Sequence, residues 1–263
     1  LSYPSPPSPP PALSRADLKT YAIDRSIMSH WKHMLRSQVD HLMEVMVGSG
    51  GFSRDFFDLI RHVGEARGRQ EEHRIIKAEI ATLKALRSSP NQPKKPKEIL
   101  VRMIYCEMLG HDASFGYIQA VNMTQQPQLI NKRVGYLACS LFLNPDHELM
   151  VLLVNSFLRD LASMNYMEVC CALNAMSRLL NKEIIPAVLP MVENLLRHQQ
   201  ELVRKKAVMV VHRCWLLDPE SVLDISDKAK TTLCDVNPCV MAASLCLFSD
   251  LIKAKPRTFK EAV

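Results

Sequence analysis

Eight cysteines are the residues of this chain with the widest range of possible chemistry, as metal ligands, disulfides or nucleophiles. No two of them have Cys-x-x-Cys spacing, and His111 and His212 have no partners arranged as a zinc site requires. Most of the cysteines fall inside apolar, helix-patterned segments, where a thiol behaves as a small core residue. The pair Cys170 and Cys171 beside Glu168 is interpreted in the same way. We therefore expect reduced, buried thiols, with no metal and no cofactor.

The sequence motifs of common enzyme classes are absent. The eight glycines are scattered along the chain, so no glycine-rich loop that cradles a phosphate is present. Gly-x-Ser-x-Gly, His-Glu-x-x-His and paired-carboxylate motifs are also missing. We predict that the chain is not an enzyme.

Two basic clusters are stronger candidates for a binding surface. The segment 91–102 places Lys94, Lys95 and Lys97 at the start of a predicted helix, where cations oppose the helix dipole. These lysines lie either in a solvated loop or in a patch that binds the phosphates of anionic lipids. The second cluster is VRKKA (203–207), for which a solvated face is the simpler interpretation, because three consecutive cations cannot share one helical face. Neither cluster has interleaved aromatic residues, so we predict no nucleic-acid binding.

The composition indicates a helical protein. Of 263 residues, 48% are hydrophobic but only 6% are aromatic, and the net charge is a modest +6. Leucine, methionine and alanine supply most of the apolar side chains, which favours helices over strands. The longest apolar run, residues 149–154, is far shorter than the roughly 20 residues that a spanning helix needs.

A repeat of about 35 residues organises most of the chain, beginning near Phe52. Four helix-patterned segments align on Val134, Val169, Val203 and Val240. The positions four residues later hold Ala138, Leu173, Ala207 and Ser244, and those seven residues later hold Leu141, Met176, Val210 and Leu247. A second helix is expected in each repeat, over residues 146–162, 183–197 and 219–233. This pattern predicts an all-α fold, a right-handed α-solenoid of HEAT/armadillo-like helix pairs.

A corner between two helices is expected at residues 109–114. Gly110 is suited to end the first helix, and Ser114 is predicted to be the N-cap of the second. Residues 1–50 form a separate region, which is Pro/Ser-rich and either disordered or a gene-model extension, with a possible short helix within 17–47. Residues 51–263 are expected to form the solenoid.

Several motifs resemble the large subunits of the heterotetrameric adaptor-protein complexes, the adaptin family of vesicle coats. The first is Met-Leu-Gly-His-Asp-x-x-Phe-Gly (108–116), and the second is Lys-Arg-Val-Gly-Tyr-Leu (132–137). The stretches EIIPAVLPMVENLL, VRKKAV and VMAASL are most similar to the epsilon branch, which belongs to the fourth adaptor complex. The resemblance covers about 52–263, so that the solenoid would be the N-terminal part of an adaptin trunk.

The resemblance implies a scaffold that holds a sigma small subunit and assembles with a beta large subunit and a mu medium subunit. It also implies recruitment by an Arf-type small GTPase to the cytosolic membrane surface, where the complex sorts the tails of transmembrane cargo. The expected location is cytoplasmic, peripheral on Golgi and trans-Golgi network membranes and coated vesicles. These properties belong to vesicle-mediated intracellular protein transport.

The resemblance also implies binding residues. Family members bind Arf through apolar side chains that correspond to Ile118, Val121 and Leu152; the alternative is that all three are core residues. Since Ile118 and Val121 are three residues apart, we expect them to share a helix face. The cluster of Lys94, Lys95 and Lys97 corresponds to a phosphoinositide site, and Arg61 to a basic residue near a site for dileucine cargo.

A cargo-binding solenoid of the nuclear-transport type, with no membrane role, is the rival interpretation. Repeats of that type present regular acidic or Asn-rich inner faces. The aligned positions in this chain hold Cys171, Lys205 and Ala242, which favours the adaptor interpretation.

Overall fold

The computed structural model describes residues 53–88, 96–225 and 229–254, and within them every regular element is a helix. The α-helices are α3 (Arg54–Glu65), α4 (Arg69–Ser88), α5 (Pro96–Met108), α6 (Tyr117–Thr124), α7 (Leu129–Phe142), α8 (Met150–Leu161), α9 (Tyr166–Leu179), α10 (Ile185–Leu195), α11 (Glu201–Leu217) and α13 (Pro238–Ala254). The 3-10 helices are η1 (Ser114–Gly116), η2 (Glu220–Ile225) and η3 (Thr231–Cys234). None of the helices described combines the length and apolar character needed to cross a membrane. The region 1–50, with its possible helix, lies outside the described residues.

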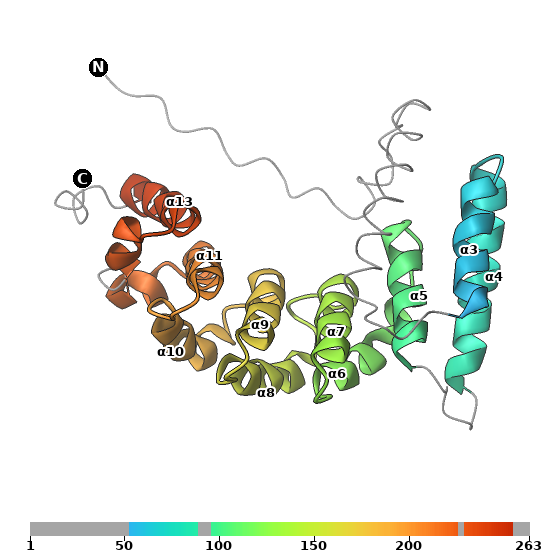
Figure 1. Cartoon of the computed structure of the whole chain (residues 1–263), viewed down its shortest axis with the longest axis horizontal. Coiled ribbons are helices and arrows are strands. Elements are labelled where there is room, and N and C mark those ends of the chain that lie inside the picture. The colour runs from blue at the N-terminus through green and yellow to red at the C-terminus, as the bar shows by residue number, and fades with distance from the viewer. Residues whose placement is uncertain (1–52, 89–95, 226–228, 255–263) are drawn as a thin grey trace, which may run out of the picture. The chain divides into compact units, whose positions relative to one another are not determined.

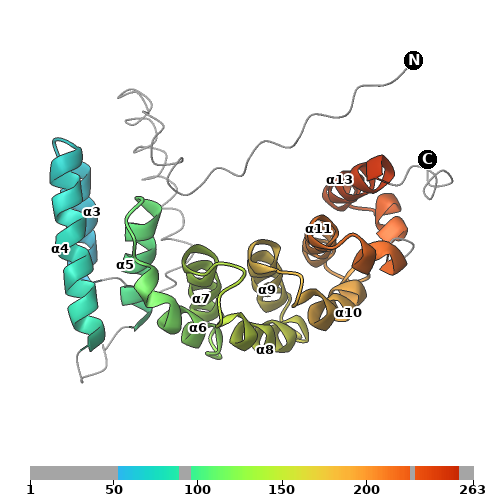
Figure 2. The same cartoon turned by 180° about the vertical axis from the view of Figure 1, so that it is seen from behind.

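From α6 onward the helices form two rows (Figures 1 and 2). In one row α7, α9, α11 and α13 pack side by side in chain order, and in the other row α6, α8 and α10 do the same. Each helix of the second row also packs against the helix that follows it in the chain. The predicted all-α solenoid of helix pairs is confirmed.

The predicted repeat register is the register of the core. The four aligned valines are at most 1% exposed, and so are the residues four positions later. At the position seven residues later, three of the four side chains are buried and Leu141 is half-buried. The positions that the alignment identified are therefore those at which neighbouring helices meet.

Close packing between α6 and α7 depends on Gly135. A Cβ atom at this position would lie 2.6 Å from the backbone nitrogen of Thr124 and 3.0 Å from the carbonyl oxygen of Ala120. Since both are backbone atoms, α6 would have to move to make room for any other residue. Gly135 thus sets the distance between these two helices.

The corner at 109–114 forms as predicted, with one correction. Gly110 has a φ of +86°, and the N–H groups of Gly110 and His111 donate to the carbonyl oxygens of Glu107 and Cys106, closing α5 with a Schellman motif. The prediction of Ser114 as an N-cap is wrong. Ser114 is the first residue of η1, and its N–H and hydroxyl both donate to Asp112 Oδ1, because that carboxylate forms the turn instead.

The predictions of the second helix in each repeat agree with the structure to different degrees. The prediction over 183–197 contains α10, whereas α8 starts four residues later than expected because residues 145–149 form a turn. The prediction of one helix over 219–233 is wrong, since this stretch contains the separate 3-10 helices η2 and η3. Polar residues 224, 226 and 227 interrupt its apolar pattern, which leaves no continuous face to bury.

Candidate partner-binding surface

Two of the three residues implied for Arf binding are exposed on neighbouring helices. Ile118 on α6 is 46% exposed and Leu152 on α8 is 47% exposed, and the two helices pack against each other. Val121 is only 2% exposed. Residues three apart are neighbours on a helix surface, but the helices packed on α6 cover Val121 and leave Ile118 accessible. We call Ile118 and Leu152 the α6–α8 patch.

Polar contacts fix α6 relative to α8 beneath this patch. Arg159 of α8 donates to the carbonyl oxygen of Thr124, the last residue of α6, at 3.0 Å. The Thr124 hydroxyl donates to the carbonyl oxygen of Val121 at 2.7 Å and lies 3.4 Å from the Ser156 hydroxyl. Both Thr124 and Ser156 are buried, so the contact between their hydroxyl groups is shielded from water, whereas Arg159 is exposed. The two exposed side chains consequently stand on a rigid base.

The turn before α6 is held from the other side by α4. The carbonyl oxygen of Phe115 accepts a hydrogen bond from Arg87 at 3.2 Å, and the Lys84 ammonium lies 5.1 Å from the centre of the Phe115 ring. Gly116 packs against the side chains of Met103 and Phe142, and a Cβ atom there would require Met103 to move. These contacts orient the first turn of α6, on which Ile118 lies.

A buried ion cluster joins α7, α8 and α9. The Lys132 ammonium is 2.8 Å from Asp160 Oδ1 and 2.8 Å from Glu168 Oε2, and the Tyr136 hydroxyl donates to Asp160 Oδ2 at 2.7 Å. Burial disfavours the charge on Lys132, but its hydrogen bonds to Asp160 and Glu168 outweigh burial and raise its pKa. Burial and the bond to Asp160 raise the pKa of Tyr136. Sequence analysis missed this cluster. The only sign of it in the sequence was Lys132, a lysine on an otherwise apolar helix face.

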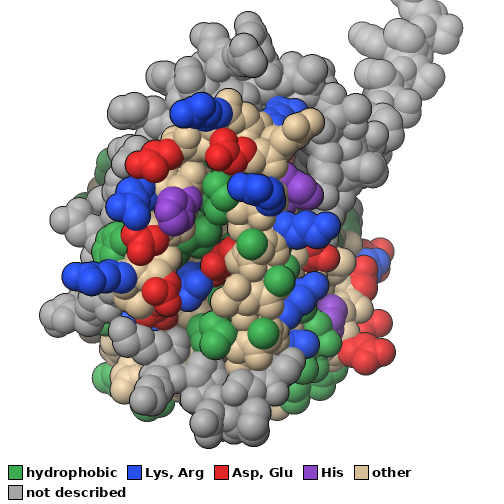
Figure 3. Space-filling view, turned by 90° about the vertical axis from the view of Figure 1, so that its right-hand side faces the viewer, with side chains coloured by type: hydrophobic (Ala, Val, Ile, Leu, Met, Phe, Trp, Pro, Cys, Tyr) green, Lys and Arg blue, Asp and Glu red, His purple; other side chains and the backbone are tan. Residues whose placement is uncertain are grey.

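The basic residues implied for lipid and cargo binding are dispersed. Lys94 and Lys95 lie outside the described residues, and Lys97 is half-buried in the first turn of α5. Arg61 is exposed on α3 and pairs with Asp58 at 2.8 Å. Figure 3 faces the α3–α4 end and shows Lys and Arg side chains interspersed with Asp and Glu. This face carries mixed charge.

The cluster VRKKA lies on α11, where its first cation has a structural contact. Arg204 forms two hydrogen bonds to Asp235, at 2.6 and 2.8 Å, and so attaches α11 to the segment before α13. These bonds lower the pKa of Asp235. Lys206 contacts Asn174 of α9. Sequence analysis interpreted the cluster as a solvated face, whereas all three of its cations are half-buried.

All eight cysteines are free thiols, but their expected burial is only partly correct. Burial raises the pKa of the Cys106 and Cys214 thiols to about 12, which keeps them protonated and unreactive. The remaining buried thiols are Cys139 and Cys170, and Cys171 is half-buried. The prediction is wrong for three exposed thiols, Cys234, Cys239 and Cys246, which lie on or near the outer side of α13. In the part of the chain that the structure describes, no group of three or more potential ligands forms a metal site.

Comparison with known proteins identifies related chains. A model of the adaptin N terminal region matches residues 72–263. The AP-4 complex subunit epsilon of Arabidopsis thaliana is 51% identical over 224 residues, which are 84% of this chain and 24% of that protein. The AP-4 complex subunit epsilon of Dictyostelium discoideum is 50% identical over 210 residues, 79% of this chain and 19% of that protein. The chain thus spans a quarter or less of the length of these relatives.

A similar fold occurs in a homology model of the full-length AP-3 complex in an intermediate open conformation. The superposition has a TM-score of 0.56 and 25% sequence identity, and it covers 64% of this chain and 30% of that chain. The predicted resemblance to the epsilon branch is confirmed by the AP-4 relatives. This chain, with its solenoid of helix pairs and the α6–α8 patch, belongs to the adaptin N-terminal region family.

Proposed function

We propose that this chain is a scaffold in an adaptor complex that serves vesicle-mediated intracellular protein transport, and that it acts by binding alone. The proposal is supported by its membership of the adaptin N-terminal region family and by relatives that carry the name AP-4 complex subunit epsilon. The solenoid architecture supports it as well, because stacked helix pairs offer long surfaces for partner proteins. The nuclear-transport alternative has no comparable support among these relatives.

The partners proposed for the scaffold are a sigma small subunit, a beta large subunit and a mu medium subunit. The complex would sort transmembrane cargo at the trans-Golgi network, and the segment with Lys94, Lys95 and Lys97 would contact anionic lipid there. Arg61 remains a candidate for the vicinity of a dileucine-cargo site, with its guanidinium group already paired to Asp58.

The α6–α8 patch is proposed to bind a GTP-loaded Arf-type GTPase. The observation that carries this proposal is the pair of exposed aliphatic side chains, Ile118 and Leu152, on two helices that are fixed to each other. Exposed aliphatic residues on a rigid base suit protein contacts, because they lose little conformational entropy on binding. Val121 would support the patch from the core.

The test is a titration of the full chain, co-expressed with the sigma subunit of the fourth adaptor complex, against an Arf-type GTPase. The GTPase is loaded either with a GTP analogue or with GDP, and isothermal calorimetry measures the affinity. We expect GTP-selective binding that Ile118→Glu and Leu152→Glu each weaken by about tenfold or more.

Met209→Glu is the matched control, because Met209 on α11 is also 47% exposed but lies in the other row of helices. It should bind like the unsubstituted chain. Binding that ignores the nucleotide, or that Met209→Glu weakens as much as Leu152→Glu does, would refute the role of the patch.

A further inference from the structure

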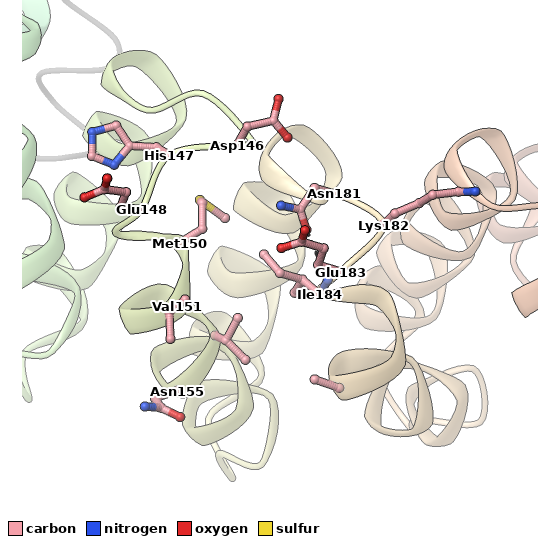
Figure 4. Close-up of a pocket in the computed structure, with 12 residues that line it drawn as sticks. Asp146, His147, Glu148, Met150, Val151, Asn155, Asn181, Lys182, Glu183 and Ile184 are labelled. Carbon is pink, nitrogen blue, oxygen red and sulfur yellow. Dashed lines mark hydrogen bonds between the residues drawn. The ribbon is translucent and has the colours of Figure 1, made fainter.

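A groove lies between α8 and α10, on the side of α8 that faces away from α6 (Figure 4). Its volume is about 610 Å³. Aliphatic side chains form much of its lining, namely those of Met150, Val151, Val154, Ile184 and Ala187. Val151 is 72% exposed, which is unusual for an aliphatic residue in a helix that packs on three others.

The groove is acidic although the whole chain is basic. Asp146, Glu148 and Glu183 line it and are exposed, and within the described part of the chain none of their carboxylates forms a hydrogen bond or an ion pair. Figure 4 shows Glu183 extending into the gap between the loops that precede α8 and α10, and Asp146 above that gap. Glu148 points away from Glu183, on the far side of its own loop (Figure 4). An excess of lining carboxylates beside aliphatic side chains favours a ligand that is both cationic and apolar.

Two other polar side chains of the groove, Lys182 and Asn181, are already engaged. The Lys182 ammonium lies 3.5 Å from Asp218, and that pairing offsets the one Lys or Arg charge of the lining. Asn181 donates to the carbonyl oxygen of Pro145 and accepts from the N–H of Ile184. The exposed carboxylates are therefore the groups left to receive a ligand's charge.

The groove is separate from the α6–α8 patch. Arg159 and Ser156 show which side of α8 faces α6, because both contact Thr124. Val151 and Val154 lie on a different side of α8 from Ser156 and Arg159, and they line the groove. Substitutions in the groove and in the patch therefore test different surfaces of one helix.

We propose that this groove binds a segment of a partner polypeptide in which lysine or arginine residues flank aliphatic side chains. A small molecule suits it poorly, because small-molecule sites bury about 70–90% of the ligand surface, whereas this groove is open at Val151. A peptide places aliphatic side chains against Val151, Val154 and Ile184 and basic side chains against the carboxylates. The proposal does not depend on whether the α6–α8 patch binds a GTPase.

The test uses a set of fluorescein-labelled ten-residue peptides and the full chain. Each peptide has an aliphatic centre flanked by Lys and Arg, and each has a counterpart with Glu at the flanking positions. In anisotropy titrations we expect the tightest basic peptides to bind at least about tenfold more tightly than their acidic counterparts, and this preference to shrink as salt screens the charges. If no basic peptide binds more tightly than its acidic counterpart, the proposal is overturned.

Substitutions locate the binding. Glu183→Lys should weaken the basic peptides and strengthen their acidic counterparts, whereas Glu65→Lys, which makes the same change of charge on exposed α3, should do neither. Val151→Asn, which removes the aliphatic contact without adding charge, should weaken both peptide types, and Leu152→Asn on a different side of α8 should weaken neither. Basic-peptide binding that responds equally to Glu183→Lys and Glu65→Lys would show a general charge effect and overturn the proposal.

Discussion

The α3–α4 end and the α7–α9 centre of the solenoid are built from helices of the same kind but are stabilised differently. Helix α4 has 20 residues, of which Ile76 and Leu83 are the buried hydrophobic ones. Helix α9 has 14 residues, of which seven are buried. Among the described helices the number of neighbours differs, because α4 packs on α3 and α5, whereas α9 packs on α7, α8 and α11. In a fold of stacked helix pairs, the stability of a helix depends on the area that it buries against its neighbours.

Ion pairs differ between these two regions in the same way. Asp58 and Arg61 on α3 form a pair that is largely exposed, with their side chains 48% and 60% accessible. Asp160 and Lys132 form a pair whose side chains are 0% and 7% accessible. Water compensates for the loss of the first pair but has no access to the second. The first pair lies on the surface of one helix, and the second joins α7 to α8 in the interior.

The largest effect is expected when the buried pair is broken. Asp160→Ala removes the acceptor shared by Lys132, Tyr136 and Arg159, which leaves a buried cation and a buried hydroxyl poorly compensated. We expect the free energy of unfolding to fall by about 3–5 kcal/mol. Urea denaturation followed by circular dichroism measures it.

Asp58→Ala on α3 is the control for the buried pair. Because this carboxylate is exposed, its loss should cost no more than about 0.5 kcal/mol. If Asp58→Ala and Asp160→Ala lowered the free energy of unfolding equally, the two regions would not differ in how their ion pairs stabilise them.

A smaller effect is expected at Gly135, where α6 and α7 approach closely. Gly135→Ala places a methyl group 2.6 Å from a backbone nitrogen, and we expect a loss of about 1–3 kcal/mol in the same denaturation assay. Gly68→Ala, just before α4, has no atom within 4 Å of the added carbon and should be close to neutral. A neutral Gly135→Ala would mean that α6 can shift, and the patch on it would then lack a rigid base.

The smallest effect is the acid sensitivity of the contact between Arg204 and Asp235. The pKa of Asp235 is lower in the folded chain than in the unfolded one, so its stabilisation is present above the unfolded pKa, about 3.9. That stabilisation is lost as the pH falls through the folded pKa. The stability difference between the unsubstituted chain and Arg204→Gln should therefore narrow below about pH 4. If the stability difference between the two chains stays constant down to pH 2, the ionised Asp235 side chain is not the source of that difference.

Much of the fold was predictable because a helix buries one side at a fixed period. The valines at 134, 169, 203 and 240 marked the packed faces, and Gly110 marked a helix end that requires a positive φ. The resemblance to adaptins rested on linear motifs, which the sequence carries completely. The 3-10 helices η2 and η3 in place of the expected helix at 219–233 could not be predicted, because the short apolar stretch there is compatible with several kinds of turn.

The sequence by itself determined the helices, their register and the family. Only the tertiary structure decided that Ile118 is exposed while Val121 is buried, and that Lys132 meets carboxylates from α8 and α9. It also decided that acidic residues of two loops line one groove together with Val151. The physical reason is that periodicity specifies which residues share a helix face. How many neighbouring helices cover that face, and which charges they bring, depends on segments tens of residues away.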